Sequence, residues 1–314
     1  MNLEYQLLIA FVLDLVLGDP RRFPHPVKII GGLAAALEGP FRNIYRNEYF
    51  AGALVVITVL TLTGAVVTMA LHLAALASPV LADALSIFLL YTTIAARDLS
   101  RHALDVHDSL AAGDLEEARR RVGFMVGRDT GNMDTTEVVR AAVESTAENT
   151  SDGVTAPLFW ALIGGPLGAV LYKAVNTMDS LFGHRDERYG RFGWAAARLD
   201  DVFNYIPARL TGVFIVLAAA LVRLDAAGAF KVMRRDGKRH PSPNAGFPEG
   251  AVAGALGVRL GGLNTYGGKT SLRPFIGDDT RPLEIDDIRR ANALMWVTTV
   301  LFFIAGVFVR AAFV

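Results

Sequence analysis

Apolar and polar segments alternate along the 314 residues of this chain. A hydrocarbon core about 30 Å thick requires roughly 20 mostly apolar residues in a helix, because a helix satisfies its own backbone hydrogen bonds there. The pattern therefore predicts an all-α, polytopic integral membrane protein. The segments that approach the required length are predicted to span the membrane: 3–17, 51–77, 79–96, 153–175, 205–224 and 292–313.

Two of these segments have unusual features. Gly164, Gly165 and Pro166 stand in the middle of 153–175. Proline removes a backbone donor and bends a helix, so this segment is predicted to be a broken or re-entrant helix. The segment 3–17 is short and contains Asp14, but it lacks the basic start and the cleavage site of a secretory signal, which indicates a retained element.

The polar regions between the spans are 18–50, 97–152, 176–204 and 225–291, and the last of them holds 11 lysines and arginines. The excess of basic residues in the first, second and fourth regions predicts a cytoplasmic location for them. Re-entrant or tilted elements are expected to return 176–204 to the same face. Because these regions are interleaved with the spans and no repeat is visible, the sequence predicts one membrane domain over 1–314 with large, helical, cytoplasmic loops.

The second polar region is predicted to be helical. Leu99, Ala103, Val106 and Leu110 recur at helical spacing, and the pattern resumes over 115–126 after Gly113 and Asp114 interrupt it. This spacing is typical of an amphipathic hairpin with a solvated charged face. Farther along, Asp134 followed by Glu137 predicts a capping box that starts another helix.

On that helix Arg140, Glu144 and Glu148 are spaced four residues apart, so they share one face. As a surface ladder they would contribute only a few tenths of a kcal/mol per pair. However, Asn149, Ser151 and Asp152 follow directly before an apolar segment, where unpaired charge is costly. Ion pairing, metal binding or substrate binding is therefore the favoured interpretation.

Similar polar clusters stand at other span ends. The segment 18–27 sets Asp19 near Arg21, Arg22 and His25, and a rigid turn with interfacial anchors explains it equally well. Carboxylates and amides in 176–210 suit Mg²⁺. The glycine-rich segment 242–269 could line an anion site with backbone N–H groups. The polar residues singled out in these two segments are Asn176, Asp179, Asp186, Asp200, Asp201, Asn204, Asn244, Glu249, Tyr266 and Lys269.

Composition excludes several functions. Basic and acidic residues number 31 each, so there is no net positive field for a nucleic acid, and the absence of cysteine excludes thiolate catalysis and disulfides. Five residues separate Gly262 from Gly268 where a Walker A motif requires four. Motifs of zinc proteases, serine hydrolases and protein kinases are also absent.

Eight motifs in order, across nearly the whole chain, resemble the CobD/CbiB family of cobalamin biosynthesis proteins, the adenosylcobinamide-phosphate synthases. They are GDPRRFPHPV, RD at 97–98, VGRDT, ESTAENTSDG, NTMDS, YGRFGWAAARLDDVFNYIPARL, SPNAGFPEGAVAGAL and LGGLNTYGG. Leu181 with Phe182, and Gly250, depart mildly from the pattern without removing a polar group.

The resemblance implies a multi-pass ligase of the cytoplasmic membrane, with its active face in the cytoplasm, that joins adenosylcobyric acid to (R)-1-aminopropan-2-ol or its O-phosphate. ATP and Mg²⁺ would activate the corrinoid carboxylate as an acyl phosphate or acyl adenylate. Expected partners are these substrates, the lipid bilayer, and a second copy or other corrinoid-assembly membrane enzymes, with no nucleic acid.

The residues can be assigned roles in such a reaction. Glu144, Glu148 or His25 is expected to act as the base, and Arg128, Arg140, Arg185 and Lys269 to hold phosphates. Further substrate-binding positions are Asn176, Asn204, Asn244, Glu249 and Tyr266. The expected magnesium ligands are Glu144, Glu148, Asp152, Asp179, Asp200 and Asp201.

Two other functions stay open at this point. Membrane proteins related to the regulator AmpE belong to the same superfamily, and such a protein would sense without synthesis. A transporter would suit Asp14, Asp83 and the intramembrane glycines, although no inverted repeat is visible.

Overall fold

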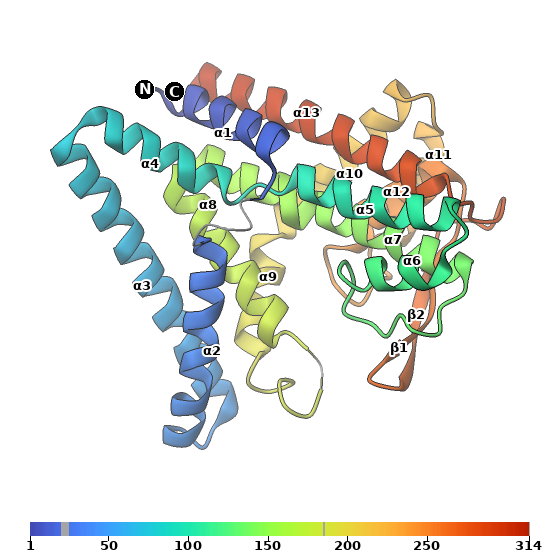
Figure 1. Cartoon of the computed structure of the whole chain (residues 1–314), viewed down its shortest axis with the longest axis horizontal. Helices are drawn as coiled ribbons and strands as arrows, with labels where there is room; N and C mark the ends of the chain where they lie inside the picture. The colour runs from blue at the N-terminus through green and yellow to red at the C-terminus, as the bar shows by residue number, and fades with distance from the viewer. Residues whose placement is uncertain (20–24, 185, 314) are drawn as a thin grey trace. The chain divides into compact units, whose positions relative to one another are not determined.

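The chain is predominantly helical, as the sequence predicts (Figure 1). The structure, a computed structural model, describes residues 1–19, 25–184 and 186–313. The helices are α1 (Leu3–Leu17), α2 (Pro26–Ile44), α3 (Glu48–Ala77), α4 (Pro79–Tyr91), α5 (Ala96–Ala111), α6 (Leu115–Val122), α7 (Thr135–Thr150), the π-helix η1 (Ser151–Thr155), α8 (Ala156–Phe182), α9 (Trp194–Phe203), α10 (Tyr205–Leu221), α11 (Ala226–Asp236), α12 (Gly246–Leu256) and α13 (Asp287–Phe313).

Four helical stretches of the described chain are long and apolar enough to cross a membrane, and α9 with α10 adds a fifth if the two form one broken span. The four are Glu48–Ala77, Pro79–Ala111, Thr135–Phe182 and Asp287–Ala312. The predicted element at 3–17 forms α1, whose 15 residues are fewer than the roughly 20 that a straight span requires, and its crossing of the membrane stays a prediction.

The predicted break in 153–175 is confirmed within α8. Gly165 adopts φ 59° and ψ −150°, which lies outside the helical region, and Pro166 follows it. A side chain at Gly165 would strain this left-handed backbone, so glycine permits the kink and proline prevents the regular hydrogen bond from re-forming.

The described chain divides into two compact units, each assembled from distant segments. Unit 1 comprises 1–95, 156–204 and 306–314, and unit 2 comprises 96–155 and 205–305. The prediction of one membrane domain over 1–314 stays a prediction beside this division. In unit 1 the two chain termini lie together (Figure 1), where Arg310 Nε is 3.1 Å from Glu4 Oε1.

The core of unit 1 is packed between α2, α3, α8 and α9. Ala51, Val55 and Val59 on α3 are fully buried. Gly52 permits close approach, because a Cβ there would lie 1.8 Å from the carbonyl oxygen of Phe192. Replacement of Gly52 by any other residue would therefore displace the segment that precedes α9.

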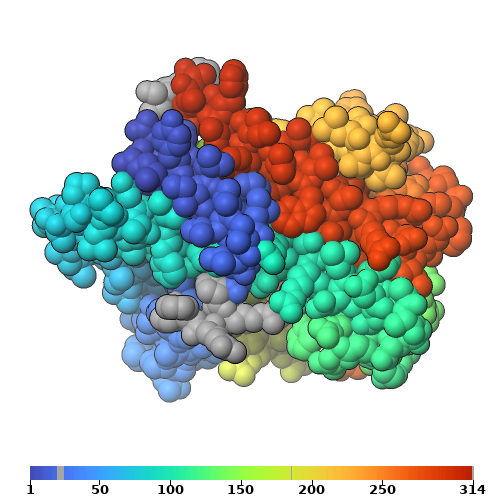
Figure 2. Space-filling model, turned by 45° about the horizontal axis from the view of Figure 1, so that its top comes forward, coloured from blue at the N-terminus to red at the C-terminus, as the bar shows by residue number. Residues whose placement is uncertain are grey.

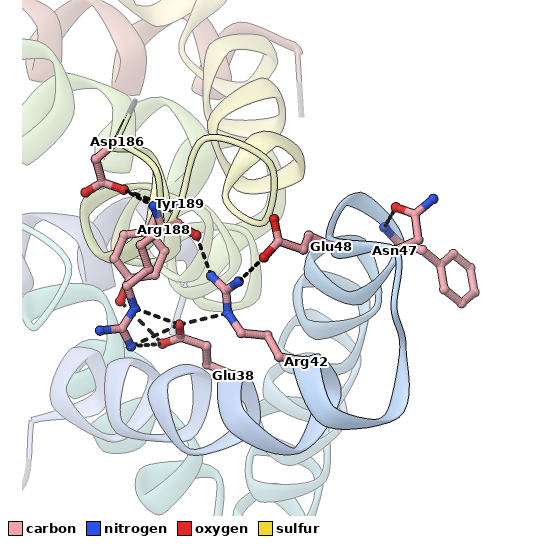
Figure 3. A network of polar contacts seen from close by, with 8 residues as sticks. Glu38, Arg42, Asn47, Glu48, Asp186, Arg188 and Tyr189 are labelled. Carbon is pink, nitrogen blue, oxygen red and sulfur yellow. Dashed lines mark hydrogen bonds and ion pairs between the residues drawn. The ribbon is translucent and has the colours of Figure 1, made fainter.

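A polar network at one end of unit 1 ties α2 to the loop before α9 (Figure 3). Arg42 donates to Glu38 Oε1 at 3.0 Å, to Glu48 Oε1 at 2.7 Å and to the carbonyl oxygen of Arg188 at 2.7 Å. Glu38 also accepts from Arg188 and from the hydroxyl of Tyr189. All three nitrogens of Arg42 and both oxygens of Glu38 are thus engaged within the protein.

In unit 2, α11 and α12 pack at unusually short range through glycines. A Cβ on Gly254 would lie 2.2 Å from the carbonyl oxygen of Gly228. Every residue from Pro248 to Leu256 is buried, including the carboxyl-bearing Glu249. In Figure 2 the green segment that contains α5 and α6 lies at the surface, and there α6 carries the exposed charges that its sequence predicts.

One feature of unit 2 was not predicted, an antiparallel hairpin of β1 (Leu260–Tyr266) and β2 (Lys269–Ile276). Gly267 and Gly268 join the strands with φ 54° and 76°. Positive φ at both central residues matches the type I′ turn that suits a two-residue hairpin. The glycine pair predicted as part of an anion-binding loop therefore forms a strand connection.

The predicted capping box at the start of α7 is confirmed. Asp134 accepts from the backbone N–H of Glu137 at 2.8 Å, and Glu137 accepts from the backbone N–H of Asp134 at 2.9 Å. At its other end α7 passes directly into the π-helical turn η1, a form that is rare and frequent at functional sites. The helix therefore holds the face with Arg140 and Glu144 between two well-defined ends.

Candidate functional site

A buried ion pair between Arg128 and Glu144 forms the centre of the candidate site in unit 2. Arg128 Nη2 lies 2.7 Å from Glu144 Oε2, and the two side chains are only 4% and 6% exposed. The second oxygen of Glu144 accepts from the backbone N–H of Gly261 at 2.7 Å. Arg128 Nη1 donates to the side-chain oxygen of Asn264. Helix α7, the loop before it and β1 thus meet at one carboxylate.

Arg140 lies next to this pair, one helical turn before Glu144. Its Nη2 donates to the carbonyl oxygen of Leu263 at 2.8 Å and to Asn264 Oδ1 at 3.3 Å, and its Nη1 donates to the carbonyl oxygen of Gly261. The predicted helix face therefore does not form a solvated surface ladder. Its guanidinium is directed at the backbone of β1.

A second buried pair, Glu249 and His240, belongs to the same unit. His240 Nε2 is 3.7 Å from Glu249 Oε1, with the side chains 6% and 2% exposed. Burial raises the pKa of Glu249 well above its ordinary value, and the charges of Glu144 and Glu148 add to this effect. Burial and nearby Arg273 lower the pKa of His240 to about 4. His240 is therefore neutral at pH 7.

Arg273 on β2 connects this pair to Tyr266. One of its terminal nitrogens donates to the hydroxyl of Tyr266 at 2.7 Å, and the other lies 3.5 Å from His240 Nε2. The hairpin thus brings a cation to the outer side of the Glu249–His240 pair.

Several buried polar atoms in this part of the described chain have no hydrogen-bond partner. An unpaired buried donor or acceptor lowers the free energy of unfolding by about 1–3 kcal/mol, so such atoms mark a part of the fold that is less stable than it could be. Most of those in unit 2 belong to the residues just described or to the adjoining π-helical turn. They are Arg128 Nε, Arg140 Nε, Glu249 Oε1, Asn264 Nδ2 and Ser151 Oγ.

Two cavities open beside the hairpin and the start of α7. One has a volume of about 360 Å³ and the other about 490 Å³, and Glu137, Arg140 and Leu263 line both. Asn264 lines the larger cavity and also accepts hydrogen bonds from Arg128 and Arg140. The larger cavity is therefore connected to the buried ion pair through one amide side chain.

Unit 1 holds a separate polar group between α8 and α9. Asn204 donates to Asp200 Oδ2 at 2.9 Å and accepts from the hydroxyl of the fully buried Tyr172 at 2.9 Å. Asn176 donates to the other oxygen of Asp200 at 3.4 Å. Three of the predicted positions, Asn176, Asp200 and Asn204, are thus brought together here.

The other predicted positions in unit 1 are more dispersed. His25 caps α2 by accepting from the backbone N–H of Val27 at 3.2 Å, and its Nε2 lies 2.7 Å from Asp19 Oδ1. That contact lowers the pKa of Asp19. Asp201 lies 3.2 Å from the exposed Arg198, and Asp179 is on α8. The predicted phosphate ligand Arg185 and the basic residues Arg21 and Arg22 lie outside the described residues.

In unit 2, Asn244 accepts from Arg209 at 3.2 Å, Asp152 is in the π-helical turn, and Lys269 is exposed opposite Tyr266 in the hairpin.

No group of three or more histidines and carboxylates is placed to hold a metal ion within the described ranges. The predicted magnesium ligands are divided between the units, with Glu144, Glu148 and Asp152 in unit 2 and Asp179, Asp200 and Asp201 in unit 1.

Three residues of the site were not singled out by sequence reasoning as site residues: His240, Asn264 and Arg273. The two-residue Gly-Gly turn would have predicted the hairpin and so placed Asn264 and Arg273 on facing strands.

The described residues are those of a helical, polytopic membrane protein. One of its two units contains a buried ion pair between a carboxylate and a guanidinium group. The family described as CobD/Cbib protein matches residues 7–295. The chain belongs to this family, and its role is in cobalamin biosynthesis.

Similar proteins carry the same description. The chain is 49% identical over 289 residues to a cobalamin biosynthesis protein CobD of Geobacter metallireducens, covering 92% of this chain and 91% of the relative. Proteins of that name from Clostridium perfringens (44% over 306 residues, 97% of each chain) and Leptospira interrogans (43% over 302 residues, 96% of each chain) are also similar. No solved structure matches the chain.

Proposed function

We propose that this protein joins adenosylcobyric acid to (R)-1-aminopropan-2-ol or its O-phosphate in an ATP-dependent reaction. A carboxylate is a poor electrophile, so a corrinoid propionate would first displace pyrophosphate or ADP from ATP and become an acyl adenylate or acyl phosphate. Attack by the amine then forms the amide and releases AMP or phosphate, and the amine nitrogen loses a proton.

The observation that carries this proposal is the buried site of unit 2 in a member of a cobalamin biosynthesis family. Arg128 and Arg140 each have a buried Nε without a partner. Guanidinium groups form strong, directional hydrogen bonds to phosphate and carboxylate oxygens, so these residues suit the charge that builds up during activation.

We assign the proton-accepting role to Glu249, with His240 beside it. Both oxygens of Glu144 are engaged, by Arg128 and by the backbone of Gly261, so Glu144 is better suited to hold Arg128 in place. Burial raises the pKa of Glu249, so its ionised carboxylate is a stronger base than that of an ordinary glutamate. Glu148, which acts on Glu249 electrostatically, is the alternative base in the same unit.

Magnesium would enter with ATP and neutralise phosphate charge, because Mg²⁺ in proteins commonly takes one or two carboxylates plus substrate phosphates. Hard oxygen donors of this type are present in unit 2 at Glu148 and Asp152 and in unit 1 at Asp179, Asp200 and Asp201. Lys269, Asn244 and Tyr266 stay proposed substrate contacts. The basic loops support a cytoplasmic active face.

The test is synthesis by the purified protein in detergent. Adenosylcobyric acid, aminopropanol O-phosphate and Mg-ATP are mixed with the protein, and the corrinoid product is analysed by mass spectrometry. The proposal expects a mass gain equal to the amine minus water that requires ATP. If the mass does not change under conditions in which a homologous synthase works, a regulatory function becomes the better explanation.

A further inference from the structure

The two cavities of unit 2 share Arg140 and Glu137 but differ in how their charges are satisfied. In the smaller cavity the other two arginines have partners within the protein. Arg259 lies 2.9 Å from Asp279, and Arg281 lies 2.6 Å from Asp287. Their charge is neutralised locally, so these two arginines have little to offer a charged ligand.

In the larger cavity of about 490 Å³ two carboxylates are fixed by backbone groups. Asp129 accepts from the N–H groups of Gly267 at 3.1 Å and Gly268 at 2.8 Å. Glu137 is fixed by the capping box. Neither carboxylate forms an ion pair with a lysine or arginine among the described residues. Both are therefore held in place without being neutralised.

Arg140 and Asn264, which both carry N–H donors, line the same cavity. Arg140 contacts only carbonyl and amide oxygens through its terminal nitrogens, and its Nε is buried without a partner. Asn264, only 4% exposed, accepts from Arg128 and Arg140 at its oxygen, which fixes its amide orientation. Its Nδ2 is consequently directed away from these cations and is also without a partner.

We infer that this cavity binds a small zwitterion, with its ammonium group between Asp129 and Glu137 and its anionic group on Arg140 and Asn264. The inference rests on the proposed function, in which such a ligand is the amine substrate in its phosphorylated form. Asn264 joins the cavity to Arg128 and Glu144, so the anionic end of the ligand would lie nearest to the groups assigned to carboxylate activation.

Glu137→Gln is the sharpest variant, because glutamine at this helix position still completes a capping box while the negative charge is lost. The expected result is a rise of at least tenfold in the KM for aminopropanol O-phosphate, with the KM for ATP and the thermal stability unchanged. Arg259→Gln, which alters only the smaller cavity, is the matched control and should leave all three values unchanged.

A second variant tests the anionic end. Arg140→Gln should raise the KM for the phosphate ester much more than that for unphosphorylated aminopropanol. This ratio is insensitive to a general loss of folded protein. Equal KM values for wild type and Glu137→Gln, or an unchanged ratio in Arg140→Gln, would overturn the inference while leaving the proposed synthesis intact.

Binding without turnover separates the two proposals. Calorimetry with aminopropanol O-phosphate alone should show binding to wild type and a Kd at least tenfold higher for Glu137→Gln. If that holds while no amide is formed, the zwitterion site stands and the proposed synthesis fails. If wild type synthesises amide but Glu137→Gln binds the amine equally well, the inference about this cavity fails.

Discussion

The protein contains two polar networks built from the same residue types, and they differ in whether the fold satisfies them. In the network of unit 1, all three guanidinium nitrogens of Arg42 and both carboxylate oxygens of Glu38 have partners (Figure 3). Around Arg128, Glu144 and Glu249 in unit 2, the ion pair is more deeply buried, yet neighbouring atoms have no partner.

This difference separates a structural role from a binding role. A fully paired network gains nothing from a ligand, and it fixes the loop before α9 against α2. A buried network with open donors and acceptors loses stability in the free protein and regains it when a polar ligand supplies the missing hydrogen bonds. Charge and burial alone would not have distinguished the two.

The largest expected effect is that of Glu144→Ala. It leaves the Arg128 guanidinium buried without its counter-charge, and breaking such a pair costs about 3–5 kcal/mol. We expect a large fall in thermal stability in detergent and the loss of amide synthesis. Glu144→Gln, which retains hydrogen-bonding capacity, should recover part of the stability. Unchanged stability in Glu144→Ala would show that the pair is not buried as described.

Glu38→Gln tests the closed network and should act on stability alone. It removes the charge that holds Arg42 and Arg188, and the loss of hydrogen bonds to charged groups costs about 1.5–3 kcal/mol. The synthesis rate per folded molecule should stay within about twofold of wild type, an expectation that follows from a role in folding only. A selective fall in kcat with normal stability would place this network in the site instead.

The smallest effect concerns pH. The pKa of His240 is about 4 in the folded protein and 6.5 ordinarily, so the unfolded chain takes up the proton first as pH falls. The contribution of His240 to the free energy of unfolding is complete above pH 6.5. It falls by about 1.4 kcal/mol per pH unit as the pH is lowered from 6.5 towards 4. Thermal denaturation at pH 7 and pH 5 should therefore show a smaller acid loss for His240→Gln than for wild type. An equal acid loss in both would contradict the lowered pKa of His240.

Local signals in the sequence predicted much of the fold. The capping box at Asp134 and Glu137, the kink at Gly165 and the long apolar helices depend on residues close in sequence, and the structure contains all of them. The hairpin was missed because the Gly267–Gly268 pair was interpreted as an anion-binding loop. The N-terminal helix has the predicted bounds, and whether its 15 residues cross the membrane stays a prediction.

The site was only partly predictable, because its contacts join distant segments. Glu144 and Arg140 were chosen from their shared helix face and their position before an apolar segment. Arg128 meets Asn264 across 136 residues of sequence, and no periodic pattern links the two. Likewise, His240 becomes notable only when α12 places Glu249 beside it. Which polar atoms stay unpaired is a property of packing and not of composition.

The most direct test of the central claim is the rate of ATP-dependent amide synthesis by Glu249→Gln, compared with wild type and with Glu38→Gln. Glutamine has nearly the same size as glutamate and carries no charge that burial would penalise, so the variant should be at least as stable as wild type. Loss of a catalytic base typically lowers the rate about 10²–10⁴-fold, and we predict a fall in kcat of this size for Glu249→Gln only. Synthesis at the wild-type rate by stable Glu249→Gln protein would contradict the account.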